Sequence, residues 1–280
     1  MPEEIVLNGR FVQMNEAAVS PSDRGFQFSE SVYEVIRAYN GRPFEMDRHL
    51  RRMRVSLAAL GLTSDGLDEF AEQAVSLLKR NGASDALIYM QVTSGSILRS
   101  HFRPNGLTPT RVAMLLPATP VPPQWLSKGS SAITVADQRW AMCYIKTTML
   151  LVNTAAKSQA VAAGSDDAIF VRDGFVTEAS AANVFAVYDG VIWTPAKSNY
   201  ILHGITREVV LELAGQLGIP FVEGPISAAR LAEADEVFLT GTAQELVPVT
   251  ELDGKAVGNG APGPVCDRLL KAYQRRTLGL

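Results

Sequence analysis

Cysteine and histidine are scarce in this chain of 280 residues, and neither sign of charge is in large excess. It has two cysteines, Cys143 and Cys266, and three histidines. Two lone cysteines in so long a chain do not form a disulfide scaffold and suit a reducing cytoplasm. No cysteine or histidine pair has the spacing of metal ligands, so we expect no metal site. A net charge of −3 gives no indication of binding to nucleic acid or to an anionic membrane.

Long apolar segments are missing as well. The longest runs, such as VAMLLPA, are far too short to cross a bilayer. The first residues, MPEEIVLNGR, are acidic and contain no apolar core of a signal peptide. We therefore expect a cytoplasmic protein. With 47% hydrophobic and 20% charged residues, the composition is that of a globular protein with ample material for a core.

Short turn signals divide much of the chain into strands. Asn-Gly and Asp-Gly dipeptides tolerate positive φ and are typical of tight hairpins between β-prone residues. Four such hairpins are predicted, at residues 5–13, 35–46, 169–178 and 184–193. Further strands are predicted at residues 85–95, 111–116 and 131–140.

Helical periodicity alternates with these strands. Residues 47–61 begin at a good N-cap, Asp47, and carry one apolar stripe at helical spacing up to Gly61. Four more helices are predicted around residues 67–82, 152–164, 206–218 and 265–276.

A proline-rich stretch, PATPVPPQ, separates two mixed halves and predicts a stiff, extended connector. We place the domains at residues 1–117, a smaller α+β domain, and 126–280, a larger α+β domain that carries Lys146, with a linker at 118–125. The predicted fold class is therefore α+β in two domains, with a cleft between them.

Lys146 stands in an apolar or hydroxylated run, CYIKTTMLL. A buried lysine is costly unless its charge is paired or its amine is neutral. Taken alone, it more often ends a strand and reaches back to water. Downstream, VTEASAANVFAV places Glu178 beside small residues, and NYILHGITREVV places Thr206 at a helix start, where free N–H groups favour an anion. FLTGTAQEL adds a second cluster of small donors, in a turn before a possible helix.

These segments, in this order, resemble the fold-type IV aminotransferases that use pyridoxal 5′-phosphate. DRGFQFSESVYEVIRAYNG and RHLRRMRVSLAALG extend the resemblance over nearly the whole chain. The family includes D-amino acid aminotransferases, branched-chain aminotransferases and aminodeoxychorismate lyases. It implies a homodimer of two-domain subunits with the cofactor in the interdomain cleft.

The resemblance also implies roles for individual residues. Lys146 would be the catalytic Schiff-base lysine that forms the internal aldimine, and Glu178 would hold the pyridine nitrogen. The remaining cofactor-binding residues implied are Arg52, Ser180, Asn183, Leu202, Ile205, Thr206, Gly241 and Thr242. Chemistry explains the choice of residue types, because an attacking amine must be neutral and a carboxylate keeps the ring nitrogen protonated.

The stretch SILRSHFRP sets the expected substrate. Arg99 and His101 would project from one face of an extended segment and could clamp a carboxylate, although a basic loop facing solvent has the same pattern. The spacing resembles the carboxylate trap of D-amino acid aminotransferases, completed by Tyr33. We therefore expect transfer from a D-amino acid to 2-oxoglutarate or pyruvate. Three alternatives have the same fold: a branched-chain L-amino acid aminotransferase, an (R)-amine transaminase and an aminodeoxychorismate lyase. A non-catalytic cofactor-binding protein would not require Glu178.

Overall fold

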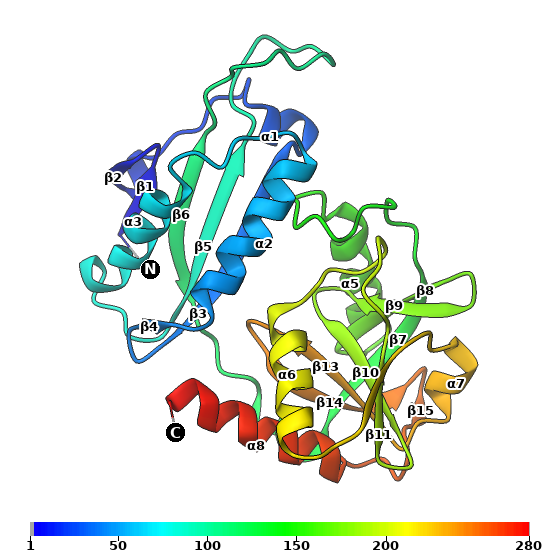
Figure 1. Ribbon diagram of the computed structural model, residues 1–280. Coiled ribbons are helices and arrows are strands. Elements are labelled where there is room, and N and C mark those ends of the chain that lie inside the picture. Colours follow the sequence, from blue (N-terminus) through cyan, green and yellow to red (C-terminus); the bar gives the residue numbers. More distant parts are fainter. Residues whose placement is uncertain (1–2, 280) are drawn as a thin grey trace. The chain divides into compact units, whose positions relative to one another are not determined.

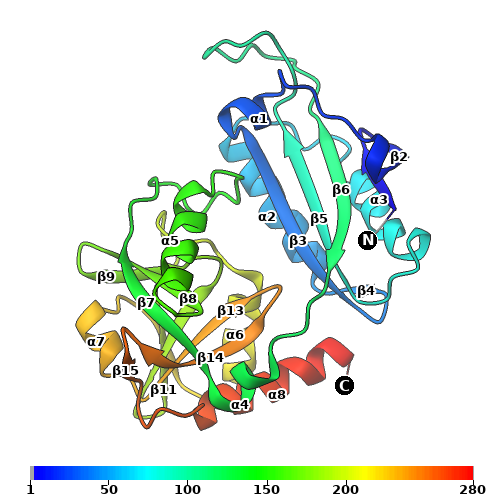
Figure 2. The same cartoon turned by 180° about the vertical axis from the view of Figure 1, so that it is seen from behind.

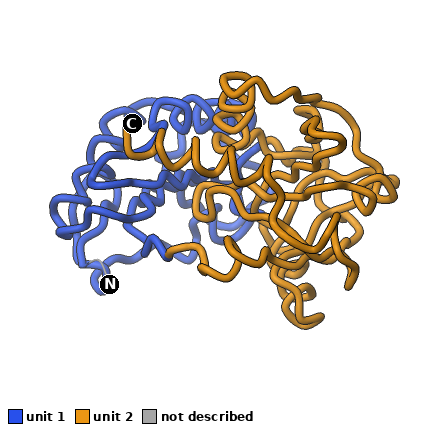
Figure 3. Tube along the Cα trace, turned by 90° about the horizontal axis from the view of Figure 1, so that it is seen from below, with its two compact units in different colours: residues 1–119, 145–149 blue, residues 120–144, 150–280 orange. Residues whose placement is uncertain are grey.

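The structure is a computed structural model that describes residues 3–279 and consists of two compact units (Figure 3). The first unit extends to Thr119 and also includes Ile145–Met149. The second consists of Pro120–Tyr144 and the chain from Leu150 onward. Each unit combines a sheet with helices, so the α+β class is confirmed.

An antiparallel sheet forms the first unit, in the order β2-β1-β6-β5-β3-β4. Its strands are β1 (Glu4–Leu7), β2 (Arg10–Gln13), β3 (Ser31–Tyr39), β4 (Arg42–Pro43), β5 (Ala86–Thr93) and β6 (Arg111–Pro117). The helical segments are η1 (Met14–Glu16), α1 (Arg24–Phe28), α2 (Met46–Ala59) and α3 (Leu67–Arg80). Helices α2 and α3 lie along the sheet (Figure 1), and Ile36, Met53 and Leu77 are fully buried there.

A nine-stranded mixed sheet forms the second unit, in the order β12-β11-β10-β13-β14-β7-β8-β9, with β15 beside β14 (Figure 2). The strands are β7 (Ser130–Ala136), β8 (Asp167–Arg172), β9 (Phe175–Ala179), β10 (Asn183–Tyr188), β11 (Val191–Thr194), β12 (Phe221–Glu223), β13 (Glu236–Gly241), β14 (Glu245–Leu252) and β15 (Lys255–Ala256). The helices are α4 (Pro123–Lys128), α5 (Leu151–Ala162), α6 (Ile205–Gln216), α7 (Ala228–Ala232) and α8 (Pro264–Leu278).

All four predicted hairpins are confirmed, as β1–β2, β3–β4, β8–β9 and β10–β11. Both residues of each turn dipeptide have positive φ, which suits the twist of the flanking strands. These dipeptides are Asn8-Gly9, Asn40-Gly41, Asp173-Gly174 and Asp189-Gly190.

The start of α2 differs from the prediction. Glu45, with φ 55°, is the N-cap, and Asp47 lies in the first turn. The Glu45 carboxylate pairs with Arg48 at 2.8 Å, so it stabilises the first turn without capping it. Asp47 still interacts favourably with the positive end of the helix dipole.

Two further predictions about elements are wrong. Residues 118–122 form no helix or strand, as expected of the connector, but its last residues begin α4, because Pro123 occupies the first helical position, where its missing N–H group costs nothing. The residues after the turn at Gly241 form strand β14 and no helix, because β13 and β14 pair in antiparallel register.

The residues around Lys146 group differently from the expected domain division. We expected Lys146 within the larger domain at 126–280, whereas Ile145–Met149 cluster with the first unit. An isolated bridge pairs Thr147 with Val32 of β3, which explains this grouping. Within residues 3–279, no helix combines the length and apolar character needed to cross a membrane.

The N-terminus of α8 depends on one buried carboxylate. Glu236 accepts hydrogen bonds from the N–H groups of Val265 and Cys266, both at 2.9 Å. A Cβ on Gly263 would lie 1.9 Å from the Glu236 side chain, so only glycine allows this approach.

Replacing Glu236 with alanine should lower the free energy of unfolding by about 1–3 kcal/mol, because two buried donors lose their acceptor. Urea denaturation of the apoprotein measures this change. Glu72→Ala, on the exposed face of α3, is the matched control and should change stability by less than about 0.5 kcal/mol. Equal stability of Glu236→Ala and the wild type would contradict the assigned role.

Candidate active site

The main chain of Lys146 is fixed by the first unit. Its carbonyl accepts from the Tyr33 N–H at 2.9 Å, and its own N–H donates to the Ser56 hydroxyl at 3.1 Å. The neighbouring Thr147 hydroxyl donates to the Ser29 carbonyl at 3.2 Å. An irregular segment is therefore held at a defined place between β3 and α2. Ser56 was not singled out in the sequence, because nothing local links it to residue 146.

The Lys146 ammonium lies over an aromatic pair. Its Nζ is 4.4 Å from the centre of the Tyr33 ring, and Tyr33 stacks on Tyr89 with centroids 5.6 Å apart. The Tyr89 hydroxyl donates to Gln91 at 2.8 Å, and burial raises the pKa of Tyr89 to about 12. The Lys146 Nζ atom therefore has a stacked aromatic pair on one side.

Arg52 forms a two-pronged ion pair with a buried carboxylate. Its Nε and one Nη donate to the two oxygens of Glu34 at 2.7 and 2.8 Å, and His49 Nδ1 lies 2.7 Å from the same carboxylate. Burial alone would raise the pKa of Glu34, but the charges of Arg52 and His49 hold it well below its usual range. Burial lowers the pKa of His49, with Glu34 opposing and Lys146 reinforcing the shift. Arg52 therefore presents a fixed cation.

Arg99 and His101 lie in an exposed loop and contact the same ring. The Arg99 guanidinium is 4.5 Å from the centre of the Phe28 ring, and the His101 ring meets it edge-on at 5.8 Å. Arg99 Nη1 also donates to Gln27 at 3.4 Å. The two side chains are thus brought together by Phe28 of α1 and not by a strand.

Arg24 anchors this loop from beneath. It is 1% exposed, donates to both Glu30 oxygens at 2.7 and 2.6 Å, and donates to the Ser100 carbonyl at 2.6 Å. The hydrogen bonds that Arg24 donates to Glu30 raise the pKa of Arg24. A buried ion pair therefore fixes the main chain between Arg99 and His101. The sequence analysis did not single out Arg24 or Glu30, although both lie in one of the quoted segments.

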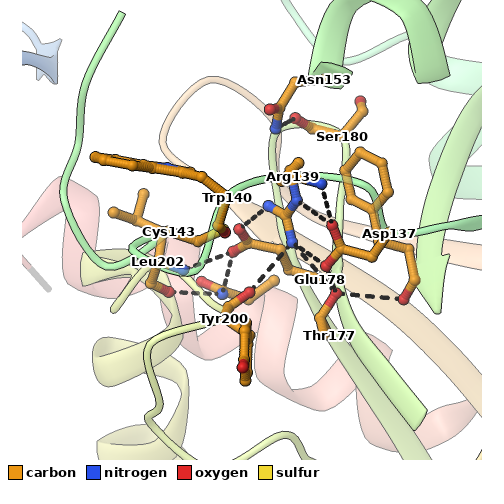
Figure 4. Close-up of polar contacts among 12 residues, drawn as sticks. Asp137, Arg139, Trp140, Cys143, Asn153, Thr177, Glu178, Ser180, Tyr200 and Leu202 are labelled. Atoms are coloured by element: carbon orange, nitrogen blue, oxygen red, sulfur yellow. Dashed lines mark hydrogen bonds and ion pairs between the residues drawn. The ribbon is translucent and has the colours of Figure 1, made fainter. Parts of the chain in front are cut away.

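Glu178 is the centre of the second unit's polar cluster (Figure 4). It is 6% exposed, close to the end of β9. One carboxylate oxygen accepts from the Leu202 N–H at 2.8 Å and from Asn183 Nδ2 at 3.3 Å. Asn183 Nδ2 also donates to the Leu202 carbonyl at 2.9 Å. Three residues predicted from the resemblance are thus in mutual contact.

Arg139 was not predicted, yet it is the strongest partner of Glu178. Its Nη1 donates to the other carboxylate oxygen, opposite the one that Leu202 contacts (Figure 4). Burial lowers the pKa of Arg139, but hydrogen bonding to Asp137 and the charge of Glu178 outweigh it and raise the value. Burial likewise opposes ionisation of Asp137, while Arg139 lowers its pKa to about 2. The available signal was an acid and a base two residues apart, near the end of the strand predicted at residues 131–140.

Ser180 is turned away from Glu178. Its hydroxyl donates to Asp167 at 2.6 Å, and its carbonyl accepts from Asn153 at 2.8 Å. Its role in the structure is therefore to fix the bend after β9, and any cofactor contact would come from its main chain.

The start of α6 approaches Asn183 closely. The helix begins at Ile205 with Gly204 as N-cap, so Thr206 lies in its first turn. A Cβ on Gly204 would lie 2.0 Å from Asn183 Oδ1, and Asn183 is held by its own hydrogen bonds. Glycine therefore allows α6 to begin beside Asn183, where the first-turn N–H groups have no acceptor within the helix itself.

β13 ends at Gly241, and the turn that follows begins with Thr242; an unsatisfied hydroxyl lies just before them. Thr240 is 1% exposed, and its Oγ1 has no hydrogen-bond partner within residues 3–279. Thr240 lies opposite Asn183 in the β10–β13 ladder, so the two side chains share one face. An orphaned donor, a helix N-terminus and a carboxylate on one unit fit a ligand with a phosphate and a basic ring nitrogen.

Metal binding has no support in the described part of the chain. No group of three or more histidine, cysteine, aspartate or glutamate side chains is arranged there to hold a metal ion.

Comparisons with known proteins agree with this chemistry. Residues 31–252 match the family model for amino-transferase class IV. The chain is 40% identical to a D-alanine aminotransferase of Bacillus licheniformis over 98% of this chain and 97% of that protein. It is 38% identical to a D-alanine aminotransferase of Staphylococcus aureus, with the same coverage.

Solved structures of branched-chain aminotransferases have the same fold. The Escherichia coli enzyme superposes with a TM-score of 0.91 at 28% identity, covering 100% of this chain and 95% of that one. A second enzyme, from the organism abbreviated T.th. and solved with pyridoxamine 5′-phosphate, gives 0.91 at 31% identity with the same coverage. A family match over most of the chain and relatives this similar along its length show that the chain belongs to the class IV aminotransferases, enzymes that depend on pyridoxal 5′-phosphate.

Proposed function

We propose that this protein transfers the amino group of a D-amino acid to a 2-oxo acid such as pyruvate or 2-oxoglutarate. The convergence of Arg99 and His101 on Phe28 is the observation that carries this proposal. A guanidinium and an imidazole two residues apart can bind the two oxygens of one carboxylate. The D-alanine aminotransferases at 40% and 38% identity support the same substrate class.

Stereochemistry connects this clamp to the D configuration. Lys146 can serve only one face of the cofactor, so the accepted enantiomer depends on which pocket takes the carboxylate and which takes the side chain. Exchanging the two groups inverts the accepted configuration. A carboxylate bound by Arg99, His101 and Tyr33 selects one arrangement, and the resemblance to D-amino acid enzymes assigns it to the D enantiomer.

The residues that would hold the cofactor come from several elements. Lys146 would bind its aldehyde carbon, Glu178 its ring nitrogen, and Arg52 and Thr206 its phosphate. Ser180, Asn183, Leu202, Ile205, Gly241 and Thr242 complete the proposed set. When bound, the cofactor supplies an electron sink for the carbanion formed at the substrate Cα.

Acid–base work is assigned to Lys146. With the cofactor bound, the Lys146 amine would accept the proton from the substrate Cα and return it to the reacting carbon of the cofactor. The hydrogen bonds to Tyr33 and Ser56 fix the main chain from which this amine extends. A fixed main chain limits the positions that the amine can occupy during transfer.

A branched-chain aminotransferase is the second candidate. It is favoured by the TM-score of 0.91 to two branched-chain enzymes, but identity to them is 28% and 31%. Fold similarity reports the shared scaffold, whereas specificity depends on individual side chains. We therefore rank D-amino acid transfer first.

A homodimer is part of the proposal. Phe26, Leu98 and Phe102 are 79%, 87% and 75% exposed, and the Asp23–Ser96 bridge brings α1 beside the loop that carries two of them. Such an apolar surface is unusual for a monomer. We propose that a second copy covers it and that the loop supplies Arg99 and His101 to the partner's site.

A cytoplasmic location is also proposed. Cys143 and Cys266 are both buried and unpaired, which suits a reducing compartment.

A donor screen tests the function directly. With pyruvate or 2-oxoglutarate as acceptor, the cofactor-loaded protein should use D-alanine or D-glutamate in preference to any L-amino acid. Initial rates of 2-oxo acid formation measure this preference. Faster turnover of L-leucine or L-valine would replace the proposal with the branched-chain alternative.

Arg99→Ala should weaken binding of a D-amino acid by about 1.5–3 kcal/mol, the value of a charged hydrogen bond, and leave the cofactor spectrum unchanged. The ratio kcat/KM measures the loss. Arg42→Ala, exposed on β4, is the matched control and should retain wild-type kinetics.

Mixed dimers extend this test to the assembly. When Arg99→Ala and Lys146→Ala subunits are mixed and allowed to exchange, one site in each hybrid regains both wild-type residues, so activity should return. Activity that stays at the level of the separate variants would show that Arg99 acts within its own subunit.

Glu178→Gln should retain the cofactor and lose roughly 10²–10³-fold in turnover, in the range seen when one preorganised electrostatic contact is removed. Both Glu178 oxygens face donors, so an amide must turn its NH₂ group toward one of them. Single-turnover absorbance and kcat report the effect, with Glu72→Gln as control. Near-normal turnover would rule out the assigned role of Glu178.

A further inference from the structure

We propose that Asp137 and Arg139 are positioning residues that hold Glu178 as a carboxylate and so keep the proton on the ring nitrogen of the bound cofactor. This inference rests on the proposed function, which assigns Glu178 to that nitrogen. Asp137 and Arg139 are two positions apart in the sequence, whereas Glu178 lies 39 positions after Arg139. The fold brings them together at the ends of β7 and β9 (Figure 4).

The Arg139 guanidinium is fixed on three sides. Its Nε and Nη2 donate to the two oxygens of Asp137 at 2.9 and 2.8 Å. Nη2 also donates to the Tyr200 carbonyl at 3.1 Å, and the Phe170 ring covers one face with its centre at 4.2 Å. The Nη1 atom therefore points at Glu178. One edge of the guanidinium binds Asp137, and the other edge donates to Glu178.

Asp137 is itself held firmly. Its side chain is fully buried, and its Oδ2 accepts from the Thr177 hydroxyl at 2.8 Å. Its Oδ1 accepts from the Arg139 N–H at 3.1 Å and lies 3.2 Å from Arg172 Nη2. These contacts leave Asp137 one orientation, and that orientation sets the direction of Arg139.

Charge balance explains why Arg139 is paired with Asp137 beside Glu178. A lone Arg139 cation would stabilise the Glu178 carboxylate, but it would also repel a protonated ring nitrogen on the other side of Glu178. Asp137 cancels the charge of Arg139 and leaves its hydrogen bond, which acts only at short range. The other groups facing Arg139 change little, since Arg172 is partly solvated and burial raises the pKa of Cys143 to about 11, keeping it neutral.

The shared proton therefore belongs on the ring. The Glu178 carboxylate and the ring nitrogen compete for one proton. Each hydrogen-bond donor that points at the carboxylate lowers the proton affinity of that carboxylate. Arg139 and the Leu202 N–H point at different oxygens of Glu178. With both donors in place, the carboxylate stays charged and the nitrogen stays protonated.

A cofactor analogue separates this role from a structural one. Wild-type and variant apoproteins are titrated with pyridoxal 5′-phosphate and with the analogue in which CH replaces the ring nitrogen, and dissociation constants are measured by fluorescence. Arg139→Gln should bind the natural cofactor about tenfold more weakly, equivalent to about 1.4 kcal/mol. The analogue should bind the variant as it binds the wild type, because it carries no nitrogen for Glu178 to hold.

Further variants test the pair. Asp137→Asn keeps the size of the side chain and removes the charge, so it should weaken binding of the natural cofactor and leave the analogue unaffected. Arg139→Lys keeps the charge but loses the planar guanidinium that donates two parallel hydrogen bonds. Its affinity for the natural cofactor should lie between those of the wild type and Arg139→Gln. The exposed Asp173→Asn and Arg275→Gln are matched controls that should bind both compounds normally. Thermal unfolding of each apoprotein identifies any variant that fails to fold.

The outcomes are distinct. Equal weakening for both compounds in folded Arg139→Lys and Asp137→Asn would overturn the inference, since the pair would then only shape the site. Unchanged binding of the natural cofactor by those variants would overturn it as well. Failure of the wild-type apoprotein to bind the natural cofactor would instead overturn the proposed function, and this inference with it.

Discussion

Paired buried charge is the constraint on which the candidate active site depends. Arg52 with Glu34, Arg24 with Glu30, and Arg139 with Asp137 each place a guanidinium against a carboxylate in a largely buried setting. Removing such charges from water is costly, and replacement by apolar residues is often neutral or stabilising. Their value here is geometric, because a two-pronged contact fixes both the position and the plane of the arginine. The first pair fixes the Arg52 cation itself, the second fixes the loop at Ser100, and the third directs Arg139 toward Glu178.

Local signals account for the elements that were predicted correctly. Asn8-Gly9 and Asp173-Gly174 specify tight turns by their own backbone preferences, and the stripe on α2 follows from spacing alone. The start of α2 and the helix at Pro123 were missed because several nearby residues could serve as a cap, and packing decides between them. The position of Glu178 near the end of β9 followed from the Asp-Gly hairpin before it.

Non-local contacts account for what the sequence did not reveal. Arg139 and Glu178 are 39 positions apart and meet only because β7, β8 and β9 are neighbours in one sheet. Arg24 reaches the carbonyl of Ser100 across 76 positions. The family resemblance named residues that would hold a cofactor, but the residues behind them were visible only in the folded chain.

The grouping of Ile145–Met149 with the first unit has a consequence for how the chain can be divided. These residues cover the side of β3 that no other strand of its sheet occupies near Val32, and the Tyr33 N–H bonds to the Lys146 carbonyl there. A gene fragment ending at Thr119 would encode every strand of that sheet and still leave this edge bare. Bare edges recruit strands from other molecules. The short segment that carries the lysine therefore also covers a sheet edge that a fragment ending at Thr119 would leave exposed.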